Sequence, residues 1–201
     1  AILSGKKIIV STGTKHLQDQ LFQRDLKTIQ QAVGKAIHVS LLKGRENYLC
    51  LHRMENMKLD QPEKNHSYMN HLHDVNLWSQ KTTKGDLAEL TEIPEDAGIR
   101  KLIVSTRENC LGQECEYYDN CFIFKARRHA NEADLTVVNH HLLLADMALR
   151  EQGYGELLPI VDVVIFDEAH QLPELASQFF SQNLTSNQFF DLTRSFPRPP
   201  V

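Results

Sequence analysis

The fold of this chain is decided by the stretch Val163-Val164-Ile165-Phe166-Asp167-Glu168-Ala169-His170, in which an apolar run typical of a strand ends in two acids, a small residue and a histidine. In an enzyme that hydrolyses a nucleoside triphosphate, the carboxyl end of a buried strand delivers one carboxylate to Mg²⁺ and the next toward the attacking water. We therefore expect a buried strand over residues 161–166, followed by catalytic acids at Asp167 and Glu168. The alternative is a core strand that leads into the acidic first turn of a helix.

Length and composition are those of an ordinary globular protein. The chain has 201 residues, of which 41% are hydrophobic and 24% charged, and its net charge is −4. These values suit one large or two small domains and neither support nor exclude a nucleic-acid partner. The longest apolar runs are too short to span a bilayer, and residues 1–12 do not resemble a secretory signal. We expect a cytoplasmic protein without a membrane partner, and the start at Ala1 and the proline-rich end indicate a piece of a larger protein.

Strand-like and helix-like segments alternate along the chain. Runs of β-branched and aliphatic residues predict short strands, and apolar residues at helical spacing predict helices between them. The predicted strands cover residues 6–12, 37–42, 135–139 and 161–166, and the predicted helices cover residues 15–26, 68–80, 120–132 and 140–150, with a further helix after His170. This alternation favours an α/β fold with a parallel sheet, into which the region of about 45–130 is inserted.

Residues 56–98 are polar and contain few aliphatic side chains. Leu72, Val75 and Trp78 lie at helical spacing, so Trp78 is expected to anchor a core rather than to stack on a ligand. The segment also holds three histidines without cysteine or carboxylate partners at regular spacing, which favours a solvated face over a metal site: His66, His71 and His73.

The chain has four cysteines: Cys50, Cys110, Cys115 and Cys121. In a cytoplasmic protein they indicate metal ligands or free thiols rather than disulfides. The absence of a Cys-x-x-Cys pair counts against a zinc ribbon, whereas wide spacing with one distant ligand suits an iron–sulfur cluster held by four thiolates. A zinc site and four reduced thiols without metal remain as alternatives. Because the inserted region has little apolar content, we expect a cluster to act as a clip whose loss unfolds residues 45–130 far more than the sheet.

Three sequence features together carry a family resemblance. They are Lys43-Gly44-Arg45-Glu46-Asn47-Tyr48-Leu49-Cys50, the group of three later cysteines, and Val137-Val138-Asn139-His140-His141-Leu142-Leu143-Leu144-Ala145-Asp146 leading to the acidic box at residues 167–170. The combination resembles the iron–sulfur superfamily 2 DNA helicases related to XPD, and within them the bacterial DinG branch. The likeness covers nearly the whole chain, and the combination is highly specific although each motif alone is not.

The resemblance implies a partial RecA-like sheet that carries an inserted, mostly helical domain with a [4Fe-4S] cluster. It implies an ATP-dependent 5′-to-3′ helicase that translocates on single-stranded or forked DNA, in DNA repair or in tolerance of replication blocks, with a replication or repair protein as a candidate partner. The four cysteines carry over as cluster ligands, Asp167 as the ligand of Mg²⁺ and Glu168 as the group that activates water. His170 would couple the ATP site to motion. The segment that grips the DNA backbone carries over as Thr12, Thr14 and Lys15.

Local explanations exist for parts of this DNA-binding set. Thr12 is also explained as the end of a strand, and Thr14 as a helix N-cap. Single-stranded DNA requires a cationic groove with stacking platforms, for which the candidates are Lys43, Arg45, Lys125, Arg127, Arg128 and His129, with Tyr117, Tyr118 and Phe122 among them. The run of residues 125–129 is also explained as a solvated helix face. A cluster on Cys50 would fix the position of Arg45, which lies five residues before it.

One motif of the family is absent from these 201 residues, the phosphate-binding loop Gly-x-x-x-x-Gly-Lys-[Ser/Thr]. A second motor domain with its arginine finger is absent as well. Without the lysine and the backbone cradle, Mg-ATP has only half a site. We therefore expect that this chain alone does not hydrolyse ATP, although its parent does.

The predicted organisation has four segments. Residues 1–44 form the first part of a motor domain, 45–130 the cysteine-rich insertion, 131–178 the continued motor domain with the acidic box, and 179–201 a tail or the start of another insertion. The alternative function is a zinc-dependent DNA- or protein-binding module without ATPase activity, in which the acidic box has arisen by chance.

Overall fold

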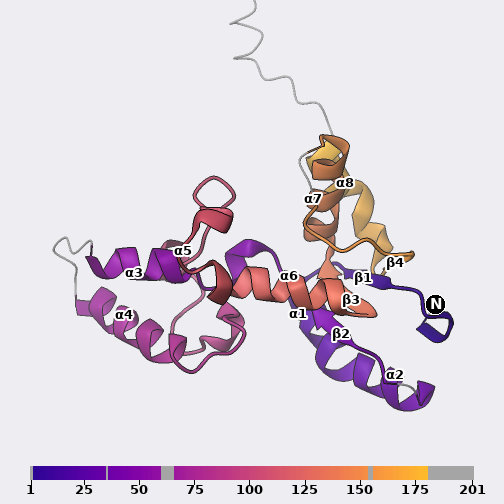
Figure 1. Cartoon of the computed structure of the whole chain (residues 1–201), viewed down its shortest axis with the longest axis horizontal. Coiled ribbons are helices and arrows are strands. Elements are labelled where there is room, and N and C mark those ends of the chain that lie inside the picture. The colour runs from indigo at the N-terminus through magenta and orange to yellow at the C-terminus, as the bar shows by residue number, and fades with distance from the viewer. Residues whose placement is uncertain (1, 35, 60–65, 154–155, 181–201) are drawn as a thin grey trace, which may run out of the picture.

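A computed structural model describes residues 2–34, 36–59, 66–153 and 156–180 (Figure 1). Its four parallel strands form one sheet in the order β2-β3-β1-β4. The strands are β1 (Ile8–Thr12), β2 (Val39–Leu41), β3 (Leu135–Asn139) and β4 (Val163–Phe166). The predicted α/β fold with a parallel sheet is confirmed. The predicted tail lies mostly outside the described residues, as does the side chain of His66.

Helices connect the strands as a parallel sheet requires. After β1 the chain is helical from α1 (Lys15–Gln20) through a π-helical segment (Leu21–Asp25) to α2 (Leu26–Val33). The predicted helix is therefore longer than expected and ends at Gly34, whose φ of 65° is the left-handed conformation that glycine adopts readily at helix ends. Helix α7 (His140–Glu151) follows β3, and a 3₁₀ turn (Ala169–Gln171) and α8 (Leu172–Phe180) follow β4.

Neighbouring side chains of β1 pack in two different apolar clusters, because successive side chains of a strand point to opposite faces of the sheet. Ile8 and Val10 pack in a cluster with Leu26. Ile9 belongs to a second cluster, which also contains Val138 of β3. The sheet is thus packed on both faces where β1 and β3 lie.

The segment between β2 and β3 is helical throughout its regular elements (Figure 1). Its α-helices are α3 (Leu51–Leu59), α4 (His66–Ser79), α5 (Gly98–Leu102) and α6 (Phe122–Glu132). Its 3₁₀ turns are Arg45–Asn47, Leu87–Glu89, Gly112–Glu114 and Tyr118–Asn120. Figure 1 shows α3, α4 and α5 to one side of the sheet, with α6 running from them back toward β2 and β3.

The inserted segment has an apolar core, so the expectation that it is too polar to build one is wrong. Leu49, Val75, Leu90, Ile93 and Ile103 are each at most 1% exposed. They come from short, separated pieces of chain, which is why no single stretch of residues 56–98 reads as a core element. As predicted, Trp78 packs against this cluster.

Arg100 stabilises the irregular part of the inserted segment. Its guanidinium donates hydrogen bonds to the carbonyl oxygens of Leu87 at 2.8 Å, Leu90 at 2.5 Å and Ile93 at 2.6 Å. A planar group with five donors can satisfy several carbonyls of one loop at once. The Arg100 side chain therefore holds the loop before α5 in place through these hydrogen bonds.

The expectation that β4 is a buried strand is also wrong for this chain. Val164, Ile165 and Phe166 are 39%, 47% and 41% exposed. Among the described residues β4 pairs only with β1 and forms one edge of the sheet. An apolar run predicts a strand, but burial depends on what lies beyond that strand. Within the described ranges, no helix is long and apolar enough to cross a membrane.

Candidate functional site

A groove of about 860 Å³ lies at the carboxyl edge of the sheet, where the loops after β1, β2 and β3 meet. In parallel α/β sheets this edge is where ligands bind. We call it the carboxyl-edge groove. Its cationic lining residues are Lys15, Lys43, Arg45, Arg107 and Arg127, and its acidic lining residues are Glu46 and Glu156. Its other lining residues include Thr106, Asn139, His141, Leu142 and Phe179. Four of the predicted DNA-binding residues, Lys15, Lys43, Arg45 and Arg127, therefore line one groove.

The loop after β1 places Lys15 at this groove. Thr14 is the N-cap of α1, and its hydroxyl oxygen accepts a hydrogen bond from the Leu17 N–H at 3.2 Å. The side chain of Thr12 is fully buried, and its hydroxyl donates to the Thr14 carbonyl oxygen at 3.2 Å. The local explanations for both threonines are thus confirmed. The predicted contact of Thr12 with DNA is contradicted for its side chain, because a fully buried hydroxyl cannot reach a ligand.

Arg45 and Arg127 bring two like charges together in the groove. Burial lowers the pKa of the Arg127 guanidinium, and the nearby charge of Arg45 lowers it further, whereas Cys110, Cys121 and Asp146 act in the opposite direction. The Nη1 atom of Arg45 is buried and has no hydrogen-bond partner in the described part of the chain. A buried donor without an acceptor is costly. An anion in the groove would satisfy it and would reduce the repulsion between the two guanidinium groups.

Helix α6 separates the predicted cations into two sets. Lys125 and His129 are one helical turn apart and line a second groove, together with Phe122 and Ala126, whereas Arg127 lies on the opposite face of the helix. Arg128 is exposed, and its Nη2 donates to the Asp119 carbonyl oxygen at 3.4 Å. The six cations therefore do not form one track. Contacts of Lys125 and Arg128 with DNA stay predictions.

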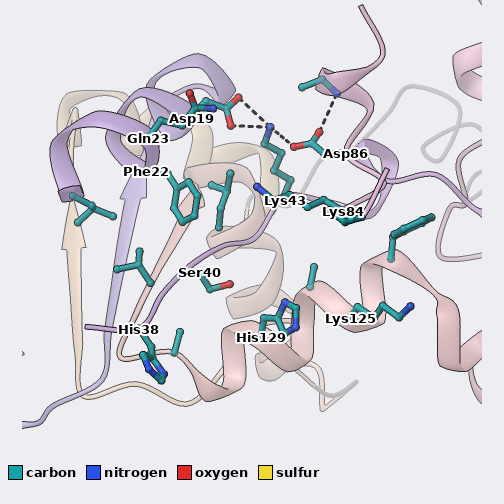
Figure 2. Close-up of a pocket in the computed structure, with 18 of the residues that line it drawn as sticks. Asp19, Phe22, Gln23, His38, Ser40, Lys43, Lys84, Asp86, Lys125 and His129 are labelled. Atoms are coloured by element: carbon teal, nitrogen blue, oxygen red, sulfur yellow. Dashed lines mark hydrogen bonds and ion pairs between the residues drawn. The ribbon is translucent and has the colours of Figure 1, made fainter. Parts of the chain in front are cut away.

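The second groove, of about 1050 Å³, lies beside β2 between the helices that follow β1 and α6 (Figure 2). We call it the β2-side groove. Lys43 lies here, only 3% exposed, and its ammonium contacts Asp19 at 2.9 Å and Asp86 at 2.8 Å. Burial alone would lower the pKa of Lys43, but the two carboxylates outweigh it and the pKa is raised above 10.5. The charge of Lys43 is thus paired with two acids, although its side chain also lines the carboxyl-edge groove. A contact of Lys43 with DNA stays a prediction.

The acidic box lies at the same edge of the sheet as the carboxyl-edge groove. Asp167 directly follows β4, and its N–H donates to the Ser11 carbonyl oxygen at 2.8 Å. Glu168 has φ 52° and ψ 40°, a left-handed conformation that is unfavourable for a residue with a side chain. A carboxylate oxygen of Glu168 lies 3.3 Å from Nδ1 of His170. The predicted catalytic residues are thus together and exposed.

Buried His140 joins the acidic box to β1, a link that the sequence pattern did not reveal. Its Nδ1 is 2.7 Å from the hydroxyl oxygen of Ser11, and its ring centroid is 6.2 Å from that of Phe166. Burial lowers the pKa of His140, although the backbone and charge of Asp167 act to raise it. The Gln171 side chain also lies against Gly13, where an added Cβ would come 2.4 Å from its amide oxygen. The loops after β1 and β4 are therefore in contact.

The four cysteines are free and half-buried, and they come from separate turns. Cys50 directly precedes α3, Cys115 ends a 3₁₀ turn and Cys121 is the N-cap residue of α6. Burial raises the pKa of the Cys50 thiol, and the charges of Cys121 and Cys115 add to this effect. The Gly112 N–H donates to Sγ of Cys110 at 3.4 Å.

The donor chemistry of these residues is that of an iron–sulfur site, because cysteine thiolates are the usual ligands of such a cluster. Among the described residues, no three His, Cys, Asp or Glu side chains form a group that could hold one metal ion. Four unpaired thiols on separate turns, which influence one another electrostatically, are a suitable donor set for a larger sulfur-bridged group. The cluster itself stays a prediction.

Two predicted stacking residues have structural contacts instead. Phe122 is 8% exposed and belongs to the apolar core. Tyr118 packs on Phe124 with ring centroids 4.6 Å apart. The groove has another aromatic residue that the sequence pattern did not single out, Phe179, which lies beside His141.

Asp146 is a further buried acid that the functional prediction did not use. One of its carboxylate oxygens accepts hydrogen bonds from the N–H groups of Leu157 at 2.6 Å and Leu158 at 3.0 Å, and the other accepts from Arg150 at 2.7 Å. This network fixes the segment that leads into β4. It therefore helps to position the acidic box without touching it.

Comparisons with known proteins identify the family of this chain. The family model DEAD_2 matches residues 11–189. The ATP-dependent DNA helicase YoaA of Haemophilus influenzae is 50% identical over 194 residues, and that of Escherichia coli is 48% identical over 194 residues; each match covers 96% of this chain and 30% of the relative. The ATP-dependent DNA helicase DinG of Photobacterium profundum is 31% identical over 203 residues, which cover 90% of this chain and 27% of the relative.

The chain thus spans about 30% of the length of the YoaA relatives that it matches. The match to the family model covers most of the chain, including the acidic box and all four cysteines. The predicted resemblance to the DinG branch is confirmed by these relatives. The chain belongs to the DEAD_2 family.

Proposed function

We propose that this chain is the part of an ATP-dependent DNA helicase that provides the acidic box and one side of a single-stranded DNA track. The observation that carries the proposal is the carboxyl-edge groove, in which Arg45 and Arg127 lie as close like charges at the edge that also bears Asp167. The names of the relatives, ATP-dependent DNA helicases, support the same reading.

The groove suits the sugar–phosphate backbone of DNA. Guanidinium groups bind phosphate with two parallel hydrogen bonds, and a groove that binds through phosphates is tolerant of sequence. The buried Nη1 of Arg45 would find its acceptor in a phosphate oxygen. Lys15, exposed beside the N-cap residue of α1, would contribute a further charge to the same track.

The acidic box would serve ATP hydrolysis in the full-length protein. Asp167 would bind the Mg²⁺ ion that accompanies the ATP phosphates, and Glu168 would orient the attacking water. His170, which contacts Glu168, would couple the ATP site to motion. The 201 residues contain no phosphate-binding loop, so this chain alone is expected to be inactive as an ATPase. A DNA-dependent release of phosphate above the buffer background by the pure chain would contradict that expectation.

Contacts between the loops after β1 and β4 would couple the acidic box to the DNA-binding loop. Asp167 is hydrogen-bonded to Ser11, and three residues further along the chain Thr14 caps the helix that carries Lys15. A movement of the acidic box during the ATP cycle would therefore shift the loop after β1, which carries Thr14 and Lys15. Movement in the 5′-to-3′ direction, a role in repair or replication-stress tolerance, a replication or repair protein as partner and a cytoplasmic location belong to the same proposal.

The four cysteines would hold a [4Fe-4S] cluster, a group that ties separate turns of chain together through iron–thiolate bonds. Since the inserted segment has an apolar core and the Arg100 hydrogen bonds, the cluster would order the turns around residues 105–121 rather than the whole insertion. Arg127 is influenced by Cys110 and Cys121, so the cluster region and the groove are adjacent.

The DNA proposal is tested by fluorescence anisotropy with the chain purified without oxygen and a short labelled single-stranded oligonucleotide. We expect binding that weakens as salt rises, because phosphate contacts release condensed counterions. An absence of binding at low salt, or binding that does not respond to salt, would contradict the proposed function.

The cluster is tested on the same preparation by its visible absorption and its content of iron, sulfide and zinc. A brown protein with about four irons and four sulfides is the expected result. A colourless protein with one zinc would instead support the alternative of a zinc-dependent binding module. Cys50→Ser should abolish the iron content, whereas the unfolding midpoint of the inserted segment should shift only modestly.

A further inference from the structure

The two sides of the carboxyl-edge groove differ in chemistry. One side is cationic and is formed by the loops after β1 and β2 and by α6, with Lys15, Arg45 and Arg127. The other side is formed by α7, the segment after it and α8. It presents an imidazole, a phenyl ring and aliphatic side chains, among them His141, Phe179, Leu142 and Ala145, together with the polar residues Gln152, Glu156 and Gln178. A ligand with an anionic side and a planar apolar face suits this lining.

The rings of His141 and Phe179 lie at the groove as an edge-to-face pair. Their centroids are 5.9 Å apart and their planes are inclined by 61°. His141, in the first turn of α7, is exposed, and Phe179, near the end of α8, is half-buried. In such a pair, the ring that presents its edge keeps both of its own faces uncovered by its partner. Because His141 is exposed and lines the groove, its ring is accessible to a third planar group.

We propose that the His141–Phe179 pair stacks a nucleobase of the single strand whose phosphates lie along Arg45 and Arg127. This inference rests on the proposed function and adds to it a contact with the base rather than with the backbone. A single strand has the required two-sided chemistry, because phosphates lie on one side of each nucleotide and an unpaired base with free faces lies on the other. A base within a duplex has both faces covered by its neighbours.

The inference has three consequences. The groove discriminates single-stranded from double-stranded DNA, although cations alone would bind both. It tolerates sequence, because every base has a π-face. It also gives α8, which directly follows the acidic box, a contact with DNA of its own. The segment from residue 167 to residue 179 would then contact ATP through Asp167 at one end and DNA through Phe179 at the other.

The test compares an ordinary oligonucleotide with one of equal length and charge that lacks its bases. Binding to the two oligonucleotides is measured at the same pH and the same salt concentration. Three chains are compared: the unchanged chain, His141→Leu, which keeps apolar bulk without an aromatic ring, and His141→Phe, which restores a ring. Circular dichroism of each variant confirms that the fold is retained.

We expect the unchanged chain to bind the oligonucleotide with bases at least about fivefold more tightly than the abasic one. His141→Leu should reduce that ratio strongly, and His141→Phe should restore it. Equal affinity of the unchanged chain for both oligonucleotides, or an unchanged ratio in His141→Leu, would overturn the stacking proposal while leaving phosphate binding intact. If the unchanged chain binds neither oligonucleotide, the proposed function itself fails.

Discussion

The two grooves on either side of α6 use positive charge in opposite ways. In the β2-side groove, Lys43 is buried between Asp19 and Asp86, so its charge holds the helix after β1 to the inserted segment (Figure 2). In the carboxyl-edge groove, Arg45 lies close to another cation, Arg127, and has a buried nitrogen for which the described residues supply no acceptor. Lys43 and Arg45 are only two residues apart in the sequence. Their surroundings, rather than their residue type, indicate that Lys43 stabilises the fold and that Arg45 is available to bind an anion.

The largest effect is expected for Lys43→Met. Removal of the ammonium leaves two carboxylates close together in a partly buried place, a change that typically costs about 3–5 kcal/mol. Because Asp19 is 29% exposed, we expect the lower end of that range for the free energy of unfolding, about 3 kcal/mol. Urea unfolding followed by circular dichroism measures it.

The matched control is Arg45→Met, which removes a cation from the other groove. It should change the free energy of unfolding by less than about 1 kcal/mol, because it also relieves repulsion with Arg127. Equal destabilisation by Lys43→Met and Arg45→Met would show that both cations stabilise the fold to the same extent, which contradicts the different roles given to the two grooves.

The salt bridges of Lys43 with Asp19 and Asp86, called the Lys43 bridge, should also make the stability of the protein depend on pH. The pKa of Lys43 is raised above 10.5 in the folded protein, so the folded state holds this proton more tightly than the unfolded state does. The stability from the bridge is fully present below pH 10.5 and is lost as the pH rises through the folded pKa. The difference in free energy of unfolding between the unchanged chain and Lys43→Met should therefore be constant from neutral pH to about 10 and shrink above it. A difference that already shrinks near neutral pH would contradict the bridge.

A smaller effect is expected for Arg45→Ala, measured as DNA affinity. Loss of one charge-assisted contact with phosphate should weaken binding about tenfold and reduce the slope of log affinity against log salt by about 1. The iron content should not change, because Arg45 is not a proposed ligand of the cluster. A loss of iron would show that Arg45 is structural.

The smallest effect is expected for Lys125→Ala, which serves as the control for Arg45→Ala. Lys125 lies on the opposite face of α6 from Arg127 and lines the β2-side groove. If DNA follows the carboxyl-edge groove alone, removal of Lys125 should change DNA affinity by less than about twofold at moderate salt. If Lys125→Ala weakens binding as much as Arg45→Ala does, DNA runs along both faces of the helix.

The strands and helices of the sheet could be predicted because each has a local cause. The β-branched runs of β1 and β3, and the Asn139 side chain that accepts a hydrogen bond from the Leu142 N–H at the start of α7, are visible in neighbouring residues. The exposure of β4 could not be predicted, since it depends on strand order. The core of the inserted segment was missed because its residues are scattered among polar ones.

The site was predicted only in part for a related reason. The pairing of Lys43 depends on Asp19 and Asp86, which lie in distant segments, and no local pattern joins them. The division of cations by α6 could have been found, because residues 125 and 129 share a helix face that residue 127 does not. The role of His140 between Ser11 and the acidic box depends on three strands lying side by side.

The carboxyl-edge groove is the proposed site of DNA binding, and photo-crosslinking tests this directly. A single-stranded oligonucleotide that contains 5-bromodeoxyuridine is irradiated with the unchanged chain, and the modified peptides are identified by mass spectrometry. We predict crosslinks in the carboxyl-edge groove, at or next to His141 and Phe179, that are lost when salt displaces the DNA. Crosslinks concentrated instead on the β2-side groove, at Phe22, His38 or His129, would contradict the account.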